Sequence, residues 1–283
     1  MNIFTAILLG IVQGVAEFLP ISSSGHLGLL HNIFGLENVE QSNMTFDVLL
    51  HLGTLVAVFI VYRRDIWEMI KEFFKLFGEA TNQRREGEKR VISMSPKRRL
   101  LIMVVIATVP LVAASLVSDY VEQLQQSTIA IGIALLITGV ILFTADRCRK
   151  GKKTEKDASF WDALIVGLAQ AVGVVPGISR SGITISAGLF SGFDREFAVR
   201  FSFLLSIPAV LGANILTLAK GGLDISAGML PAYIAGIVTA AVCGYFAIKL
   251  VKYLVDSKKF GGFAYYCWVV GLAAIAYELI FVL

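Results

Sequence analysis

The sequence predicts an all-helical membrane protein with six spans and two re-entrant hairpins, and three observations carry that prediction. Hydrophobic residues make up 56% of the 283 residues and gather in long runs, whereas soluble proteins average about 45–50%. Basic residues are confined to a few short connectors. Two apolar segments are interrupted by serine, glycine and proline, and they resemble each other. Together these features predict a single membrane domain over residues 1–283.

Six segments have the length and apolarity of membrane spans. A transmembrane helix needs about 20 consecutive apolar residues, and the runs near this length cover residues 44–62, 100–118, 127–145, 197–219, 229–251 and 263–283. Two further segments, 2–34 and 160–192, are apolar but broken by polar clusters. The cysteines have no CxxC or zinc-type spacing, so they indicate neither a disulfide nor a metal site; they are Cys148, Cys243 and Cys267.

The basic residues set the predicted orientation. Of the 25 Lys and Arg residues, 23 lie within residues 63–99, 146–157, 193–200 and 249–259. Cytoplasmic loops carry an excess of Lys and Arg, and all four regions reach one side only if both broken segments enter and leave by the same face. We therefore expect two re-entrant hairpins, a cytoplasmic loop at 63–99, and both termini outside. Basic residues confined to such loops also argue against nucleic-acid binding.

The two broken segments form an internal repeat. A shift of 157 aligns residues 6–25 with 163–182, pairing AILLGIVQGVAEFLPISSSG with ALIVGLAQAVGVVPGISRSG, and eight positions are identical. Each hairpin is followed by three spans, so the second copy is inverted relative to the first. Repeat 1 is predicted over about 1–146 and repeat 2 over about 160–283. Inverted repeats with broken helices place a site near the membrane midplane; chance similarity between Gly- and Ala-rich segments is the alternative.

Both hairpin tips have the features of an anion site. Pro20 and Pro176 end one helix, and a Ser-Xaa-Ser-Gly run then opens the next. Serine is a favoured N-cap, and a helix N-terminus presents free N–H groups and a partial positive charge. Irregular backbone inside a membrane is tolerated only where it is buried in protein or lines a cavity. The predicted substrate-binding residues are Gln13, Ser22, Ser24, Gly25, Ser179, Ser181, Gly182 and Thr184.

The candidate chemistry lies in Glu17, Ser23, His26 and Arg180. A buried arginine is expensive in a membrane and usually functional, and its planar fork suits bidentate phosphate contact. A structural ion pair between Arg180 and Glu17 is the alternative. His26 has the side chain best suited to proton transfer near neutral pH. This combination predicts phosphoryl transfer. The remaining histidines are interpreted as interfacial or packing residues; they are His31 and His51.

Two long motifs closely resemble the undecaprenyl-diphosphate phosphatase family, the membrane enzymes associated with bacitracin resistance. They are QGVAEFLPISSSGHL from Gln13 to Leu27 and PGISRSGIT from Pro176 to Thr184. The resemblance covers essentially the whole chain, including Phe46–Gly53. It implies hydrolysis of undecaprenyl pyrophosphate to undecaprenyl phosphate and inorganic phosphate in the bacterial plasma membrane, which recycles the carrier lipid of cell-wall (peptidoglycan) synthesis.

The resemblance also implies a divalent cation, Mg²⁺ or Ca²⁺, with Glu17 as its ligand. The family has Glu or Gln four residues before this glutamate, and the chain has Gln13, which leaves a single acidic candidate and puts a two-carboxylate site in doubt. The implied partners are a polyprenyl pyrophosphate lipid and the membrane, and a homodimer is left open beside a monomer.

Within this reading Ser23 is the expected nucleophile, because it lies at the centre of the first tip and aligns with Arg180. His26 would activate Ser23 or protonate the leaving group, Glu17 would orient His26 or bind the metal, and Arg180 would clamp the pyrophosphate. Direct attack by an activated water is the alternative mechanism. A transporter or flippase for a polyprenyl phosphate is the alternative function, since inverted repeats with broken helices also typify transporters.

Overall fold

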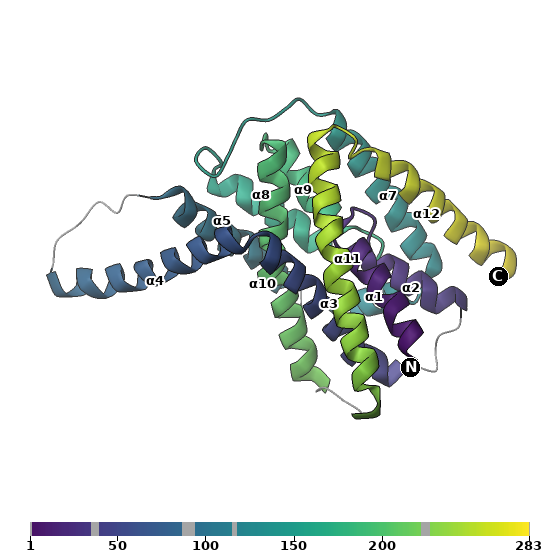
Figure 1. Cartoon of the computed structure of the whole chain (residues 1–283). Coiled ribbons are helices and arrows are strands. Elements are labelled where there is room, and N and C mark those ends of the chain that lie inside the picture. Colours follow the sequence, from purple (N-terminus) through teal and green to yellow (C-terminus); the bar gives the residue numbers. More distant parts are fainter. Residues whose placement is uncertain (1, 35–39, 87–93, 115–117, 222–226, 283) are drawn as a thin grey trace.

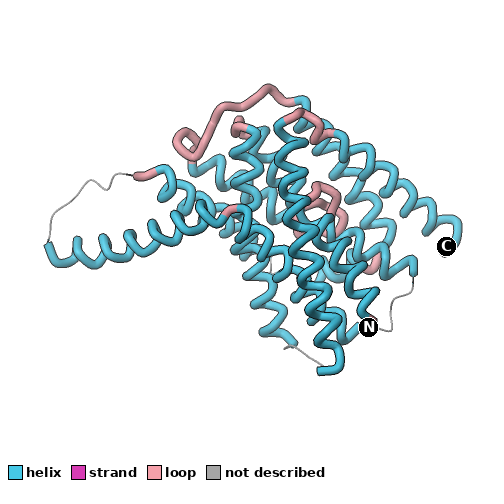
Figure 2. The backbone as a smooth tube through the Cα atoms, viewed as in Figure 1, coloured by secondary structure: helices cyan, strands magenta, loops and turns pink. Residues whose placement is uncertain are grey.

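The structure, a computed structural model, describes residues 2–34, 40–86, 94–114, 118–221 and 227–282. These residues are mostly helical, and the only strand-like pairing among them is an isolated bridge between Lys153 and Phe193 (Figure 2). The helices in chain order are α1 (Ile3–Phe18), α2 (Ser23–Phe34), α3 (Glu40–Val61), α4 (Arg63–Glu86), α5 (Pro96–Ala114), α6 (Ser118–Gln125), α7 (Thr128–Arg147), α8 (Phe160–Val172), α9 (Arg180–Phe190), α10 (Arg195–Gly221), η3 (Ala227–Met229), α11 (Leu230–Asp256) and α12 (Gly262–Phe281).

Four helices of the described chain are long and apolar enough to cross a membrane, namely α7, α10, α11 and α12. A fifth crossing would be the pair Thr45–Val61 and Arg63–Leu76, which is bent by 88° between α3 and α4. The prediction of an all-helical, multi-pass membrane protein is thus confirmed. The predicted span at 100–118 corresponds to α5, which lies outside the set that meets the same criterion of length and apolarity.

The predicted cytoplasmic loop at 63–99 is largely helical, and its side of the membrane stays a prediction. Helix α4 runs to Glu86 and α5 begins at Pro96, while residues 87–93 lie outside the described chain. The many charged residues hide an amphipathic pattern, in which Ile66, Ile70 and Phe73 recur at the spacing of one helix face. In Figure 1 α4 projects away from the other helices.

Both broken segments are helix–break–helix units, as predicted. The first break separates α1 from α2 at residues 19–22, and the second separates α8 from α9 at residues 173–179. Figure 2 shows loop segments inside the body of the molecule, between the long helices.

The helices of the two hairpins pack on spans from the other half of the chain. The most extensive contacts of α1 are with α11, whereas α8 packs mainly on α5, and α7 packs on α12. Helices α5 and α11 hold matching positions in the predicted repeat, so the exchange is reciprocal. The repeat boundaries themselves stay a prediction.

Small residues allow these exchanged helices to approach closely. A Cβ atom at Gly10 of α1 would lie 2.7 Å from the Gly236 carbonyl oxygen of α11. A Cβ atom at Gly167 of α8 would lie 2.5 Å from the Ala107 carbonyl oxygen of α5. Gly10 and Gly167 are aligned in the repeat, and close backbone contact at small residues is how helices associate in lipid. Both hairpins are therefore anchored in the same way, which places their tips against each other.

Candidate active site

The first tip is a tight turn with a strained serine. Helix α1 ends at Phe18, and the Leu19 N–H still bonds the Val15 carbonyl oxygen. Ser22 then adopts φ 70°, a left-handed conformation that is uncommon outside glycine. Its hydroxyl accepts the Gly25 N–H at 3.2 Å and so caps α2. Strained residues of this kind gather at functional sites.

The second tip makes the same cap with a different turn. The Ser179 hydroxyl accepts the Gly182 N–H at 3.1 Å and caps α9. Gly177 has φ 92°, and a Cβ there would lie 2.5 Å from the Ile131 carbonyl oxygen. Both the backbone conformation and the lack of space therefore require glycine at this position. Thr138 of α7 fixes this turn, donating to the Gly177 carbonyl oxygen at 2.9 Å and accepting the Ser179 N–H at 3.2 Å.

The two tips are joined by hydrogen bonds of the capping residues. The Ser22 hydroxyl also accepts the Gly177 N–H at 3.1 Å, and the Ser181 hydroxyl donates to the Leu19 carbonyl oxygen at 3.3 Å. The predicted N-caps are thus confirmed at Ser22 and Ser179. Ser22 and Ser181 have a further role that the sequence did not reveal, because each holds one tip against the other.

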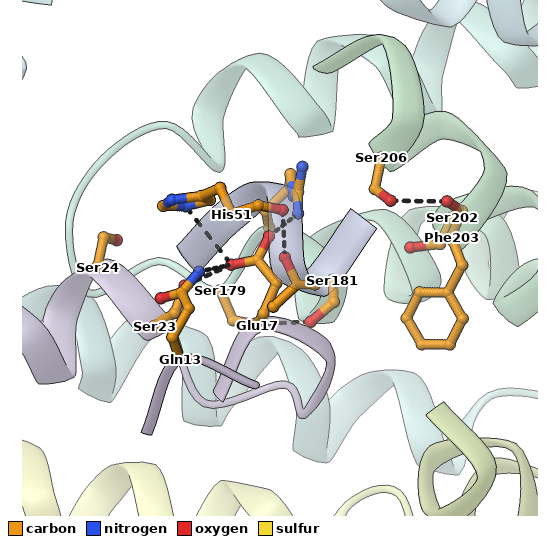
Figure 3. Close-up of polar contacts among 12 residues, drawn as sticks. Gln13, Glu17, Ser23, Ser24, His51, Ser179, Ser181, Ser202, Phe203 and Ser206 are labelled. Atoms are coloured by element: carbon orange, nitrogen blue, oxygen red, sulfur yellow. Dashed lines mark hydrogen bonds and ion pairs between the residues drawn. The ribbon is translucent and has the colours of Figure 1, made fainter. Parts of the chain in front are cut away.

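A buried polar cluster forms around the carboxylate of Glu17, which is only 7% exposed (Figure 3). Oxygen Oε2 accepts hydrogen bonds from the Ser23 hydroxyl at 2.8 Å and from Gln13 Nε2 at 3.1 Å. Oxygen Oε1 is paired with the guanidinium of Arg180. These four predicted residues therefore meet, although they come from α1, α2 and α9. A buried carboxylate is tolerated because a cation and two donors satisfy it.

His51 is also part of this cluster, which corrects its interpretation as a residue remote from the tips. Its Nε2 lies 3.8 Å from Glu17 Oε2, and its Nδ1 lies 2.8 Å from the Asp47 carbonyl oxygen. A carbonyl oxygen only accepts, so Nδ1 carries a proton and Nε2 is the nitrogen that faces the carboxylate. A histidine inside a predicted span is itself a functional signal, and that signal was available in the sequence.

His26 points away from the Glu17 cluster. Its Nδ1 donates to the Ser22 carbonyl oxygen at 2.8 Å, and its Nε2 lies 2.7 Å from the hydroxyl of Tyr266 on α12. With Nδ1 protonated, the neutral ring accepts the tyrosine hydroxyl at Nε2. In this arrangement Glu17, and not His26, contacts Ser23. Tyr266 carries no local sequence signal, because α12 follows α2 by more than 200 residues.

The other predicted binding residues lie around this centre. The hydroxyl of Ser24 is 3.4 Å from that of Ser22, and the hydroxyl of Ser181 is 3.2 Å from that of Ser179. Thr184 is turned toward α10, where its Oγ1 lies 2.6 Å from the hydroxyl of Ser202. The N–H groups of the predicted glycines are engaged by the two caps, as described above for Gly25 and Gly182.

The cluster offers a proton acceptor, a hydroxyl and a cation in one water-poor place. A carboxylate oxygen at 2.8 Å from Ser23 can take the hydroxyl proton as the oxygen attacks. Arg180 and the two capped helix N-termini can neutralise a phosphate. This set of groups fits transfer of a phosphoryl group, in which positioning and charge neutralisation supply most of the catalysis.

The described residues do not fit a metal held by the protein. Groups of three His, Cys, Asp or Glu side chains that could surround an ion are absent from the described part of the chain. Glu17 already has Arg180 on one oxygen and hydrogen-bond donors on the other. The expected role of Glu17 as a metal ligand therefore has no support from this geometry.

Comparison with known proteins links this site to one family. The family model described as "Bacitracin resistance protein BacA" matches residues 6–273. The undecaprenyl-diphosphatase of Methanosphaera stadtmanae is 41% identical over 99% of both chains. Relatives of the same name from Alkaliphilus metalliredigens and Halothermothrix orenii are each 40% identical over 99% of this chain and 100% of their own. The tips of both hairpins lie within the residues that the family model matches.

Proposed function

We propose that this chain, which belongs to the family of the bacitracin resistance protein BacA and whose relatives are named undecaprenyl-diphosphatase, hydrolyses undecaprenyl pyrophosphate at the Glu17 cluster. The single observation that carries this location is the meeting of Ser23, Glu17 and Arg180 between two helix N-termini. A hydroxyl beside its base and opposite a cation is the arrangement that phosphoryl transfer requires.

Ser23 is the proposed nucleophile. Its oxygen attacks the terminal phosphorus while its proton passes to Glu17 Oε2, which lies 2.8 Å away. The bond from that phosphorus to the bridging oxygen breaks, and undecaprenyl phosphate leaves. Water then attacks the phosphoserine, the bond from phosphorus to the Ser23 oxygen breaks, and Glu17 returns its proton to that oxygen, which releases inorganic phosphate and restores the hydroxyl. In the alternative mechanism, a water activated by Glu17 attacks the phosphorus directly and Ser23 only positions the phosphate.

Arg180 changes partner in this proposal. In the absence of substrate it neutralises Glu17, and an entering pyrophosphate replaces that carboxylate as the partner of the guanidinium. Glu17 is then released to accept the Ser23 proton. Each serine cap occupies one N–H group of its helix. The other N–H groups in the first turns of α2 and α9 contact the phosphate oxygens. Ser24 and Thr184 complete the set of predicted binding residues beside the two tips.

His26 and His51 have separate proposed roles. His51 stabilises the proton received by Glu17, because its Nε2 faces the same carboxylate oxygen at 3.8 Å. His26 lies one helical turn after Ser23, and we assign to it the protonation of the leaving group, in the form of the ring that carries a proton on both nitrogens after the Tyr266 hydroxyl has been displaced from Nε2.

For the divalent cation, we propose that Glu17 would be the protein ligand of Mg²⁺ or Ca²⁺ and that the pyrophosphate would supply the other oxygens. Hard cations prefer oxygen ligands, and Mg²⁺ is commonly bound through substrate phosphates with only one or two carboxylates. Glu17 is the one acidic side chain of the described cluster, which suits this mode better than a site made by the protein alone. A cation held in this way would supply neutralisation of charge on the substrate.

The proposed membrane layout keeps six spans and two re-entrant hairpins. We place the chain in the bacterial plasma membrane with both termini outside, because 23 of 25 basic residues then lie on the cytoplasmic side. The two halves form the inverted repeat over about 1–146 and 160–283. The reciprocal packing of α1 on α11 and α8 on α5 supports this arrangement.

The decisive experiment is phosphate release from undecaprenyl pyrophosphate by purified protein in detergent. Turnover is expected without any gradient, and Glu17→Gln should lose most of it while Glu278→Gln, a change near the end of α12, should not. Equal turnover by Glu17→Gln and the unchanged protein would move the reaction away from this cluster. Turnover that required a sealed membrane would favour the transporter alternative.

A further inference from the structure

A groove lies at the corner where α4, α5 and α10 meet. It encloses about 630 Å³, and apart from Thr108 its lining is apolar. Thr108 does not offer a free hydroxyl there, since Oγ1 donates to the Val104 carbonyl oxygen at 2.7 Å. The groove is therefore suited to a hydrocarbon and not to a polar ligand.

The groove has the length of one membrane leaflet. It follows α5 from Leu101 to Val112. At 1.5 Å per residue, the steps from 101 to 112 cover about 16 Å, which is close to half of the ~30 Å hydrocarbon core of a bilayer. One acyl chain of a phospholipid in that leaflet would lie along it.

Helix α4 closes the groove at the end where a headgroup would be. Its groove face carries Ile66 and Ile70. The neighbouring line of α4, at spacing i, i+3, i+7, carries Arg64, Trp67 and Lys71, which are all exposed. The Lys71 Nζ atom lies 5.4 Å from the centre of the Trp67 ring. Tryptophan and basic residues beside an apolar face are typical of helices in the membrane interface.

The charges of α4 are arranged for an anion on this line. The acidic residues on the other side of this line are paired with the start of α5, where Lys97 lies 2.6 Å from Asp65 and 3.3 Å from Glu68, the acidic residue that lies next to the basic line. Arg98 lies 3.1 Å from Glu72 in the same way. The basic line is thus left as the charged edge of the groove, complementary to an anionic headgroup.

The groove is separate from the phosphatase site. Ser202 of α10 reaches Thr184 at the second tip, and Ser206 lies one turn further along the same face, on the side of the cluster (Figure 3). Ile207 and Pro208, which line the groove, lie on the opposite face of α10. A lipid in this groove would therefore be separated from the Glu17 cluster by α10.

We propose that this groove binds one anionic phospholipid, with an acyl chain along α5 and the phosphate at Arg64 and Lys71. The proposal is independent of the phosphatase activity, because no residue of the groove belongs to the Glu17 cluster. A bound lipid would add apolar contacts between α4, α5 and α10 to the ion pairs that already join α4 to the start of α5.

The test is to purify the protein from micelles that hold equal amounts of phosphatidylglycerol and phosphatidylcholine, and to count retained lipids by native mass spectrometry. We expect one phosphatidylglycerol per chain. The double change Arg64→Glu and Lys71→Glu should lower its retention about tenfold or more, since each basic residue adds to anionic-lipid affinity. Val109→Trp, which fills the groove, should lower it as strongly.

Matched variants distinguish lipid bound in this groove from lipid retained elsewhere on the protein surface. Val140 on α7 is 53% exposed and Val109 is 61% exposed, so Val140→Trp is the control for bulk, and Lys150→Glu is the control for charge. Both should retain the lipid, and phosphate release in detergent should be unchanged in all variants, which shows that they are folded. Equal retention of the two lipids, retention unaffected by Val109→Trp, or recovery of a prenyl lipid in place of phosphatidylglycerol would each overturn the proposal.

Discussion

The two hairpin tips share one backbone plan but carry different chemistry. In both, a serine caps the second helix of the hairpin and a residue with positive φ makes the turn, Ser22 in the first tip and Gly177 in the second. In the alignment of the repeat, however, Glu17 corresponds to Val174 and Ser23 corresponds to Arg180. The first tip therefore holds the proton acceptor and hydroxyl, and the second holds the cation.

This difference shows how a duplicated scaffold can divide one reaction. A carboxylate and an arginine on the same tip would neutralise each other locally and leave little for a substrate. Placed on opposite tips, they pair directly with each other in the absence of substrate, and an entering pyrophosphate competes with Glu17 for Arg180. The shared caps supply the anion-binding helix ends, and the residues that differ supply the reaction.

The largest effect should come from removing the hydroxyl of Ser23 in the first tip. If Ser23 becomes phosphorylated, Ser23→Ala should reduce phosphate release below detection, since no other group can carry the phosphoryl group. If water attacks directly, the same change removes one positioning contact and should cost on the order of 10²–10³-fold. Phosphate release in detergent distinguishes the two results.

The matched control for Ser23→Ala is Ser24→Ala. Ser22 is a poorer control, because its hydroxyl accepts both the Gly25 and Gly177 N–H groups, so its loss would loosen both tips. Ser24→Ala should be clearly milder than Ser23→Ala. A Ser23→Ala protein within tenfold of the unchanged protein would remove serine from the nucleophile role and leave a water activated by Glu17.

The second tip should be broken by a change that keeps its charge. Arg180→Lys retains the cation but loses the planar fork that can serve a phosphate and Glu17 together. We expect turnover to fall on the order of 10²-fold, the effect of losing one charge-stabilising contact, with the thermal midpoint of unfolding nearly unchanged. Near-normal turnover would reduce Arg180 to a structural partner of Glu17.

The tips could be predicted because their signals are local. A proline followed by Ser-Xaa-Ser-Gly ends one helix and caps the next within a few residues, and the same pattern occurs twice. From these patterns Gln13, Glu17, Ser23 and Arg180 could be assigned to one site. Their meeting followed from the repeat, because inverted hairpins face each other.

What could not be predicted depends on packing between distant segments. His51 reaches Glu17 because α3 packs beside α1, and Tyr266 reaches His26 because the last helix passes the first tip. Helix α4 was not predicted because its sequence is rich in charged residues. Several of these residues form ion pairs with the first residues of α5. A histidine within a span is visible in the sequence, but the residue that it contacts is not, and the same holds for the partners of Tyr266 and α4.

A smaller effect is expected from a change of His51, which reaches the first tip because α3 packs on α1. His51→Gln keeps a polar side chain but removes a group able to share a proton with Glu17. We expect turnover to fall roughly tenfold, which corresponds to about 1.4 kcal/mol of transition-state stabilisation, with KM little changed. His26→Gln is the comparison, and measured kcat and KM for both would show which histidine acts in the reaction. Unchanged kcat in His51→Gln would make His51 a packing residue after all.

The smallest effect compares the two glutamines that the repeat aligns. Gln13 donates to Glu17 at 3.1 Å, whereas Gln170 is 1% exposed and neither polar atom of its side chain has a partner among the described residues. An unsatisfied buried polar group costs about 1–3 kcal/mol, and an apolar group of similar shape removes that cost. Gln170→Leu should therefore leave turnover unchanged and keep or raise the thermal midpoint in detergent. Gln13→Leu should lower turnover several-fold, because Glu17 loses a donor. If Gln170→Leu lowered the midpoint as much as Gln13→Leu, Gln170 would have a buried partner such as water, and the two tips would be more alike than their side chains indicate.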